Sequence, residues 1–281
     1  MHLLECLKKL PSMLDVQKEE APAAFADSVQ LYKICYECDG CRVMGYIALP
    51  LELPEQLPCC IYNRGGNRDF AYLRPAMICQ FAKRGLAVFA SQYRGNVGGT
   101  GMEEFGGAEV NDVIRLIDMA LAFPWSCSKK SVYMIGHSRG GMMTYLACAR
   151  DPRIKAAVVA AGISDSFIMY QSREWDMKEV YHELVGGGPK EKREEFIARS
   201  ATYWPEKIIP PMLILQGTAD WRVTPNQGRK MYRKLKEVGK ECKLIIYPGA
   251  DHSLRGTAYQ DAAVQWLLEH PLEEAKQEKS L

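Results

Sequence analysis

A serine, an aspartate and a histidine occupy positions in the sequence where they could act together on a carbonyl group. Ser138 lies in the run GHSRG, and Asp220 and His252 follow it in that order. In such a trio the histidine removes the proton of the serine hydroxyl, and the serine oxygen attacks the carbonyl carbon. The carboxylate holds the imidazole in the required tautomer. The chemistry predicted from these residues is acyl transfer.

The serine pattern becomes specific through its surroundings. G-x-S-x-G alone should arise by chance about once in ten chains of this length at ordinary glycine usage. Here it lies between the apolar run SVYMIGH at 131–137 and a helical stretch that begins at Gly140. That setting predicts a strained strand-turn-helix that lifts the serine oxygen to the edge of a sheet. Glycine is needed at 136 and 140, because a Cβ there would collide with a neighbouring strand or helix.

Asp220 and His252 each follow a predicted strand. The strand PMLILQG precedes Asp220, and the strand CKLIIYPG precedes His252. In the α/β-hydrolase fold the carboxylate and the histidine follow the serine in this order, on loops at the carboxyl ends of strands. The spacing therefore predicts that the three side chains meet at one edge of the sheet.

Other carboxylates and histidines compete for these two roles. Asp251 directly precedes His252 and so can hardly also accept a hydrogen bond from the Nδ1 of that histidine, and Asp165 follows a different strand. His137 adjoins the serine, but a residue that precedes the serine in such a turn points away from it. The remaining histidines are His2, His182 and His270. Loop position favours Asp220 as the carboxylate and His252 as the base.

The elements that position these loops are predicted from the apolar pattern. Two β-leaning runs flank Asp39-Gly40, a strong hairpin signal, so the chain opens with antiparallel strands. Continuous apolar runs then alternate with amphipathic helical stretches, which is typical of a parallel sheet covered on both faces. We predict one α/β domain over 1–281, with a mostly parallel eight-stranded sheet and a helical, lid-like insertion at about 163–205. Residues 1–28 are predicted as an N-terminal extension and 275–281 as a flexible tail.

Composition and charge argue against several other classes of protein. Hydrophobic residues make up 47% and charged residues 25%, the balance of an ordinary globular protein. Lys plus Arg is 36 against 34 for Asp plus Glu, so no basic surface for nucleic acid is indicated. The segment from Met1 to Leu14 lacks the apolar core of a signal peptide or a membrane span. We expect a cytoplasmic protein without nucleic-acid or membrane partners, and the sequence leaves a homo-oligomer open.

The cysteines do not predict a metal site. Cys35, Cys38 and Cys41 have metal-like spacing, but they are ordinary neighbours in the predicted hairpin and no fourth ligand is in evidence. A long chain that can stabilise itself by its core has little need of disulfides, so reduced thiols are expected. We predict neither a metal nor a cofactor.

Several segments resemble one known family. SQYRGNVGGTG, GAEVNDV, GHSRGGM and the stretch from YWPEKIIPPMLILQG to YPGADH are similar in spacing and residue type to the catalytic domain of prolyl oligopeptidase-like serine peptidases, family S9. The resemblance covers roughly Pro58 to Glu269. It implies an α/β-hydrolase fold and a serine hydrolase that cleaves an ester or a peptide bond in a small substrate through an acyl-enzyme.

Further site residues are expected around the serine. The backbone N–H of Arg139, at the positive end of the predicted helix, would stabilise anionic charge on a substrate oxygen. By resemblance, Gly65 or Gly66 supplies the second donor of this oxyanion hole. Family members often have His or Tyr where this sequence has Arg64. The candidate substrate contacts are Arg64, Tyr93 and Trp221.

The sequence predicts the catalytic residues but leaves the bond that they cleave open between several alternatives. Peptidases of this family usually carry an N-terminal β-propeller, and because fewer than about 60 residues precede the resemblance, we expect this chain to lack it. Stand-alone relatives of this shape resemble esterases, deacylases and small-peptide hydrolases alike. The alternatives are a carboxylesterase or deacylase without peptidase activity, and a binding protein of the same fold without turnover. Nothing in the sequence favours the binding protein, since all three catalytic positions are filled.

Overall fold

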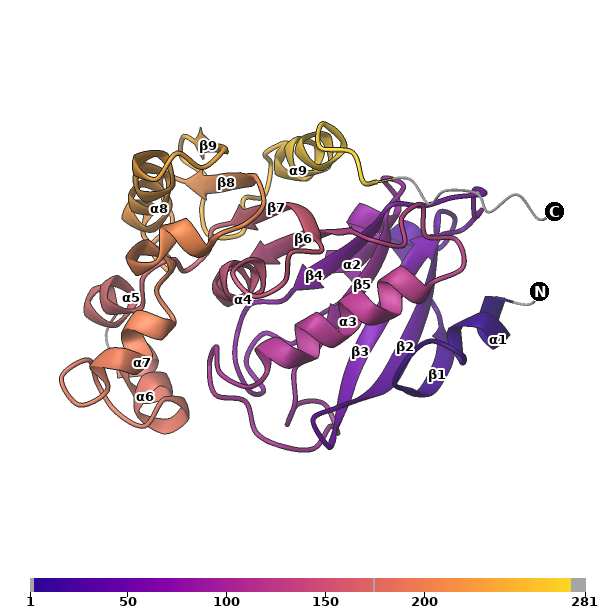
Figure 1. Ribbon diagram of the computed structural model, residues 1–281, viewed down its shortest axis with the longest axis horizontal. Helices are drawn as coiled ribbons and strands as arrows, with labels where there is room; N and C mark the ends of the chain where they lie inside the picture. The colour runs from indigo at the N-terminus through magenta and orange to yellow at the C-terminus, as the bar shows by residue number, and fades with distance from the viewer. Residues whose placement is uncertain (1–2, 174, 274–281) are drawn as a thin grey trace.

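The strands form one sheet in the computed structural model, which describes residues 3–173 and 175–273 (Figure 1). Within those residues the sheet has nine strands in the order β1-β2-β3-β5-β4-β6-β7-β8-β9. The pairs β1–β2, β2–β3 and β3–β5 are antiparallel, and the remaining pairs are parallel. The predicted α/β class with a mostly parallel sheet is confirmed. The tail predicted at 275–281 and His2 lie outside the described residues.

The elements follow one another along the chain in a simple alternation after the first hairpin. The strands are β1 (Met13–Glu19), β2 (Val29–Cys38), β3 (Cys41–Pro50), β4 (Cys59–Asn63), β5 (Ala87–Ser91), β6 (Val132–His137), β7 (Ile154–Ala160), β8 (Met212–Gly217) and β9 (Cys242–Tyr247). The helices are α1 (Leu3–Leu7), α2 (Pro75–Ala82), α3 (Val110–Ala122), α4 (Arg139–Cys148), α5 (Ser166–Ser172), α6 (Trp175–Leu184), α7 (Arg193–Ala198), α8 (Pro225–Glu237) and α9 (Tyr259–Leu268). Short 3₁₀ turns span Ala23–Phe25, Ala201–Tyr203 and Pro205–Lys207.

One strand more is present than the eight predicted. The additional strand is β1, with the sequence MLDVQKE, which forms one edge of the sheet and pairs with β2 alone. Only Val16 is buried in it. An edge strand that is exposed on both sides carries no apolar alternation, so the hydrophobic pattern cannot indicate it.

The sheet carries helices on both faces, as predicted. Along β4 successive side chains enter different apolar clusters, because neighbouring residues of a strand point to opposite faces. Ile61 packs in the cluster that includes the apolar sides of α3, α4 and α8, and Tyr62 packs in the cluster with α2 and α9. The inner strands β4, β5, β6, β7 and β8 are thus largely buried on both faces, which explains their mainly apolar sequences, whereas β9 at the edge is mostly half-buried.

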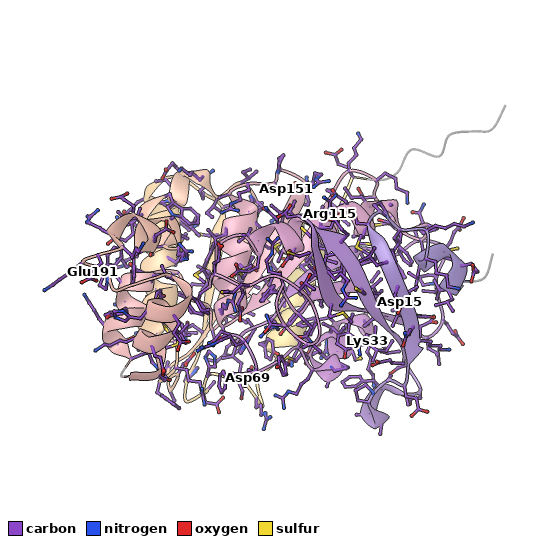
Figure 2. All side chains as sticks on the ribbon, turned by 90° about the horizontal axis from the view of Figure 1, so that it is seen from below. Asp15, Lys33, Asp69, Arg115, Asp151 and Glu191 are labelled. Atoms are coloured by element: carbon purple, nitrogen blue, oxygen red, sulfur yellow. The ribbon has the colours of Figure 1, made fainter. Side chains whose placement is uncertain are left out.

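The segment between β7 and β8 contains α5, α6 and α7, which lie together at one end of the molecule (Figure 1). Their aromatic rings pack on one another, with the rings of Tyr181 and Phe196 stacked at 4.7 Å between centroids. In Figure 2, Glu191 of this segment lies at the end opposite to Asp15 and Lys33 of the antiparallel strands, and Asp69 lies between them. The function of this segment as a lid stays a prediction.

No helix among the described residues combines the length and the apolar composition needed to cross a membrane.

Candidate active site

Ser138 occupies a sharp turn between β6 and α4. Its backbone has φ 59° and ψ −125°, a conformation that residues with a side chain rarely adopt and that costs about 1–3 kcal/mol. The Ser138 N–H donates to the carbonyl of Ala160 at the end of β7, at 3.0 Å. The neighbouring strand therefore helps to hold the strained residue at the carboxyl edge of the sheet.

The glycines on both sides of the serine are required by close packing, as predicted. A Cβ on Gly136 would overlap the carbonyl oxygen of Gly140, and a Cβ on Gly140 would overlap the carbonyl oxygen of Asn63 at the end of β4. Asn63 and Gly136 are also register partners in the β4–β6 pair. The turn consequently sits directly against the loop that follows β4.

The structure brings Ser138, His252 and Asp220 together. The distance from His252 Nε2 to Ser138 Oγ is 2.9 Å, and the distance from His252 Nδ1 to Asp220 Oδ2 is also 2.9 Å. The loops that carry the aspartate and the histidine follow β8 and β9. Because the carboxylate accepts the Nδ1 hydrogen, Nε2 is left to accept the serine proton. This arrangement can generate a nucleophilic serine oxygen.

The side chain of Asp220 accepts hydrogen bonds from several donors besides His252. Its side chain is buried, with Oδ1 accepting from the N–H groups of Arg222 at 3.0 Å and Val223 at 2.9 Å. Its Oδ2, which faces His252, also accepts from Gln216 Nε2 at 3.2 Å. These hydrogen bonds fix the direction of the Asp220 side chain.

The competing carboxylates have other partners. Asp251 is exposed and accepts from the N–H and the hydroxyl of Ser253, and these two hydrogen bonds lower the pKa of its carboxyl group. Asp165 caps the start of α5 and forms an ion pair with Lys230 at 2.6 Å. Asp220 is the carboxylate that meets the histidine ring.

His137 contacts His252 but does not contact Ser138. Its Nε2 lies 2.9 Å from the backbone oxygen of His252, and the two ring centroids are 4.9 Å apart. A carbonyl oxygen can only accept, so Nε2 carries the hydrogen. Burial, and next the nearby His252, lower the pKa of His137 to about 4, so the ring is neutral at neutral pH. The sequence analysis excluded His137 as the base and did not predict its contact with His252. The only feature of the sequence that pointed to a place in the site was its position next to Ser138.

The loop after β4 lies against the serine at Gly65. A Cβ on Gly65 would lie 2.9 Å from Ser138 Cβ, so only glycine allows this approach. Across the part of the chain that the structure describes, no hydrogen-bond acceptor meets the N–H of Gly65 or of Gly66. The N–H of Arg139 belongs to the first turn of α4, where N–H groups have no partner within the helix. These N–H groups can stabilise a developing oxyanion.

Arg64 and Tyr93, two of the expected substrate contacts, both have fully buried side chains. Arg64 donates to the backbone carbonyls of Gln92 and Gly65, and the hydroxyl of Tyr93 donates to the carbonyl of Arg64 at 2.9 Å. Burial, and next the nearby Arg139, lower the pKa of Arg64 to about 10. Arginine is usually exposed, so a loop sequence alone does not indicate that it faces inward.

Trp221, the third candidate substrate contact, is exposed to 63% of its surface. The guanidinium carbons of Arg173 and Arg222 each lie 4.7 Å from the centroid of its ring. Arg222 also lies 5.9 Å from the ring of Phe70, which is 57% exposed and belongs to the loop after β4. An exposed rim of two aromatic rings with a guanidinium between them therefore links the loop after β4 to the loop after β8.

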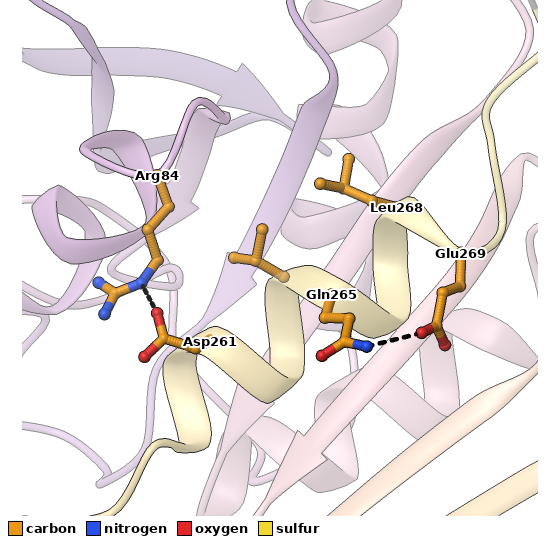
Figure 3. Close-up of a pocket in the computed structure, with 6 residues that line it drawn as sticks. Arg84, Asp261, Gln265, Leu268 and Glu269 are labelled. Carbon is orange, nitrogen blue, oxygen red and sulfur yellow. Dashed lines mark hydrogen bonds and ion pairs between the residues drawn. The ribbon is translucent and has the colours of Figure 1, made fainter.

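A pocket with a volume of about 610 Å³ lies elsewhere, along α9 (Figure 3). Arg84 forms an ion pair with Asp261 at 2.8 Å at one end of it, and Leu268 contributes its apolar side. None of the site residues described above lines this pocket.

This chain is similar in sequence to known proteins. Residues 73–276 match the prolyl oligopeptidase family. The uncharacterized peptidase YtmA of Bacillus subtilis is 34% identical over 84% of this chain and 91% of its own length. The rat acylamino-acid-releasing enzyme is 29% identical over 76% of this chain, which spans only 32% of that enzyme.

Solved structures share the fold. The acylaminoacyl peptidase of Pyrococcus horikoshii superimposes with a TM-score of 0.73 at 19% identity, over 90% of this chain and 43% of that one. The acetyl xylan esterase of Paenibacillus sp. R4 superimposes with a TM-score of 0.69 at 18% identity, over 95% and 92% of the two chains. At such identities the likeness shows the fold alone.

Proposed function

Because the chain belongs to the prolyl oligopeptidase family and is a serine hydrolase, we propose that it cleaves a carboxylic ester or a peptide bond through an acyl-enzyme on Ser138. The observation that carries this proposal is the pair of 2.9 Å hydrogen bonds that runs from Asp220 through His252 to Ser138. The substrates proposed are small esters or short peptides.

In the acylation step His252 Nε2 takes the hydroxyl proton of Ser138 as Oγ bonds to the carbonyl carbon. The negative charge on the former carbonyl oxygen is stabilised by the N–H groups of Arg139 and of Gly65 or Gly66. Asp220 stabilises the imidazolium and keeps its orientation. The imidazolium then gives its proton to the departing alcohol or amine as the bond between carbon and leaving group breaks. Water repeats the sequence on the acyl-enzyme, which releases the acid and restores the serine.

A panel of chromogenic substrates tests the proposal and separates its two branches. We expect measurable hydrolysis of short-chain p-nitrophenyl acyl esters, because p-nitrophenolate leaves without needing a proton. Aminoacyl p-nitroanilides should report amide cleavage, in which the leaving amine depends on proton transfer from His252. Turnover of anilides without any turnover of esters would contradict the expected ester activity. No turnover of either, with no fluorophosphonate labelling, would favour a binding protein.

We propose that Trp221 contacts the substrate through its exposed ring. Replacing it with alanine should raise KM about threefold to tenfold for a bulky aromatic ester, while kcat changes little, because the ring offers binding surface and no reacting atom. Steady-state kinetics of wild type and Trp221→Ala would measure the effect. The unfolding midpoint should shift little, since the side chain is 63% exposed.

Leu268→Ala provides the matched control for Trp221→Ala. Leu268 is also a large exposed apolar side chain, at 54%, but it lies on α9 (Figure 3). The Leu268→Ala variant should therefore have the KM of the wild type. An equal KM for Trp221→Ala and Leu268→Ala would remove Trp221 from the proposed substrate contacts.

A further inference from the structure

Three successive carbonyl groups in the loop after β4 are held by buried side chains. The hydroxyl of Tyr93 donates to the carbonyl of Arg64 at 2.9 Å. Nη1 of Arg64 donates to the carbonyl of Gly65 at 2.9 Å, and Nη1 of Arg139 donates to the carbonyl of Gly66 at 3.0 Å. Each of three consecutive peptide units is thus fixed by a hydrogen bond to its carbonyl oxygen.

Because each peptide unit is planar, a fixed carbonyl also fixes the direction of the N–H group in the same unit. The C=O and the N–H of a trans peptide unit point in opposite directions. Holding the carbonyls of Arg64 and Gly65 therefore turns the N–H groups of Gly65 and Gly66 away from the buried side chains. The next N–H, that of Asn67, is used within the loop, where it donates to the carbonyl of Phe70 at 3.2 Å. The N–H groups of Gly65 and Gly66 stay available to a ligand next to Ser138.

We propose that Arg64, Tyr93 and Arg139 form a positioning stack that sets the direction of the oxyanion donors. This inference rests on the proposed hydrolase function and assigns the three side chains no contact with substrate. The ring of Tyr93 lies between the two guanidinium groups, whose carbons are 5.0 Å (Arg64) and 4.9 Å (Arg139) from its centroid. All three side chains are buried, so the stack can move little.

The charge of the stack is balanced in a way that also restrains the loop. Arg139 forms ion pairs with Glu103 and, at 2.6 Å, with Glu109, and both carboxylates are buried. The carboxylate of Glu103 also accepts from the N–H of Arg68 in the same loop. Arg139 therefore links the turn at Ser138 to the loop after β4 through one direct and one carboxylate-mediated contact. Fixed donors of this kind need no reorganisation when charge develops.

Tyr93→Phe tests the stack with the smallest change, because it removes one hydroxyl and keeps the ring between the guanidinium groups. Releasing the peptide unit between Arg64 and Gly65 should lower kcat for a p-nitrophenyl ester about tenfold and leave KM within about twofold. That loss is smaller than the 10²–10³ typical of deleting an oxyanion donor, because the N–H is misdirected and still present. Arg139→Lys, which keeps a cation between Glu103 and Glu109 but loses the fork that reaches Gly66, should lower kcat further.

Inhibition by an alkyl trifluoromethyl ketone separates positioning from general damage. Such a ketone forms a tetrahedral adduct with the serine and places an oxyanion in the hole, whereas an alkyl alcohol of the same chain length cannot form an adduct. We expect the inhibition constant of the ketone to rise by the same factor as kcat falls in Tyr93→Phe, and that of the alkyl alcohol to stay constant. A purely structural role would not produce this split.

Tyr133→Phe is the matched control. Tyr133 also donates its hydroxyl to a backbone carbonyl, that of His270 at 3.2 Å, away from the loop after β4. It should reproduce any loss of stability from deleting such a bond and leave both kcat and the ketone constant unchanged. If Tyr93→Phe behaves like Tyr133→Phe, or loses kcat without weaker ketone binding, the inference is overturned and the hydrolase proposal stands. A wild type that neither turns over substrate nor reacts with the ketone overturns both.

Discussion

Replacing Ser138 with alanine should lower kcat/KM for a p-nitrophenyl ester by at least about 10⁴-fold and abolish labelling by a fluorophosphonate. The variant lacks the only atom that bonds to the carbonyl carbon in the proposed mechanism. Alanine, like serine, has a single Cβ and adds no strain at the φ of 59° beyond that already present, so the turn itself should persist. A thermal unfolding midpoint within a few degrees of the wild-type value would show that the fold is unchanged. The loss of activity would then be due to the missing serine oxygen.

The control for Ser138→Ala is a serine close to the site with a different partner. Ser253 adjoins His252, but its hydroxyl donates to Asp251 at 2.6 Å and does not contact the histidine ring. Ser253→Ala should keep both turnover and labelling. Labelling of Ser138→Ala at the wild-type rate would mean that another residue is the nucleophile, and the proposed mechanism would then be abandoned.

Asp220→Asn should lower kcat by about 10⁴-fold while the protein stays folded. An asparagine amide can donate to Nδ1 of His252, and the ring would then carry its hydrogen on Nε2. In that tautomer Nε2 cannot accept the proton of Ser138. The amide also loses the negative charge that stabilises the imidazolium. Steady-state kinetics with a p-nitrophenyl ester measures the loss, and unfolding of the variant by heat checks its stability.

Asp251→Asn tests whether removing any carboxylate near His252 lowers activity, or only the one that bonds to its Nδ1. Asp251 is the residue next to His252, is exposed, and bonds to Ser253 rather than to the imidazole. Its replacement should change kcat less than about threefold, because the tautomer of His252 does not depend on it. Comparable losses in Asp220→Asn and Asp251→Asn would refute the assignment of Asp220 as the orienting carboxylate.

The strands around the site could be predicted because their sequences carry their own signal. β4, β6, β7 and β8 are largely buried on both faces, and apolar residues predominate in them. Parallel strands place their carboxyl ends at one edge, so the loops with Ser138, Asp220 and His252 could be expected to meet there. The edge strand β1 carries no such signal, because neither of its faces is fully covered.

The chain by itself determined which residues could carry out acyl transfer and the order of the loops that hold them. Tertiary structure alone decided which way the side chains of those loops face. Arg64 and Tyr93 look like substrate contacts in the sequence, yet they are buried and hold the backbone on which the oxyanion donors lie. Tyr93 reaches the carbonyl of Arg64 across 29 positions, and Ser138 reaches His252 across 114. Contacts between such distant segments depend on how strands pair and pack, which no local pattern encodes.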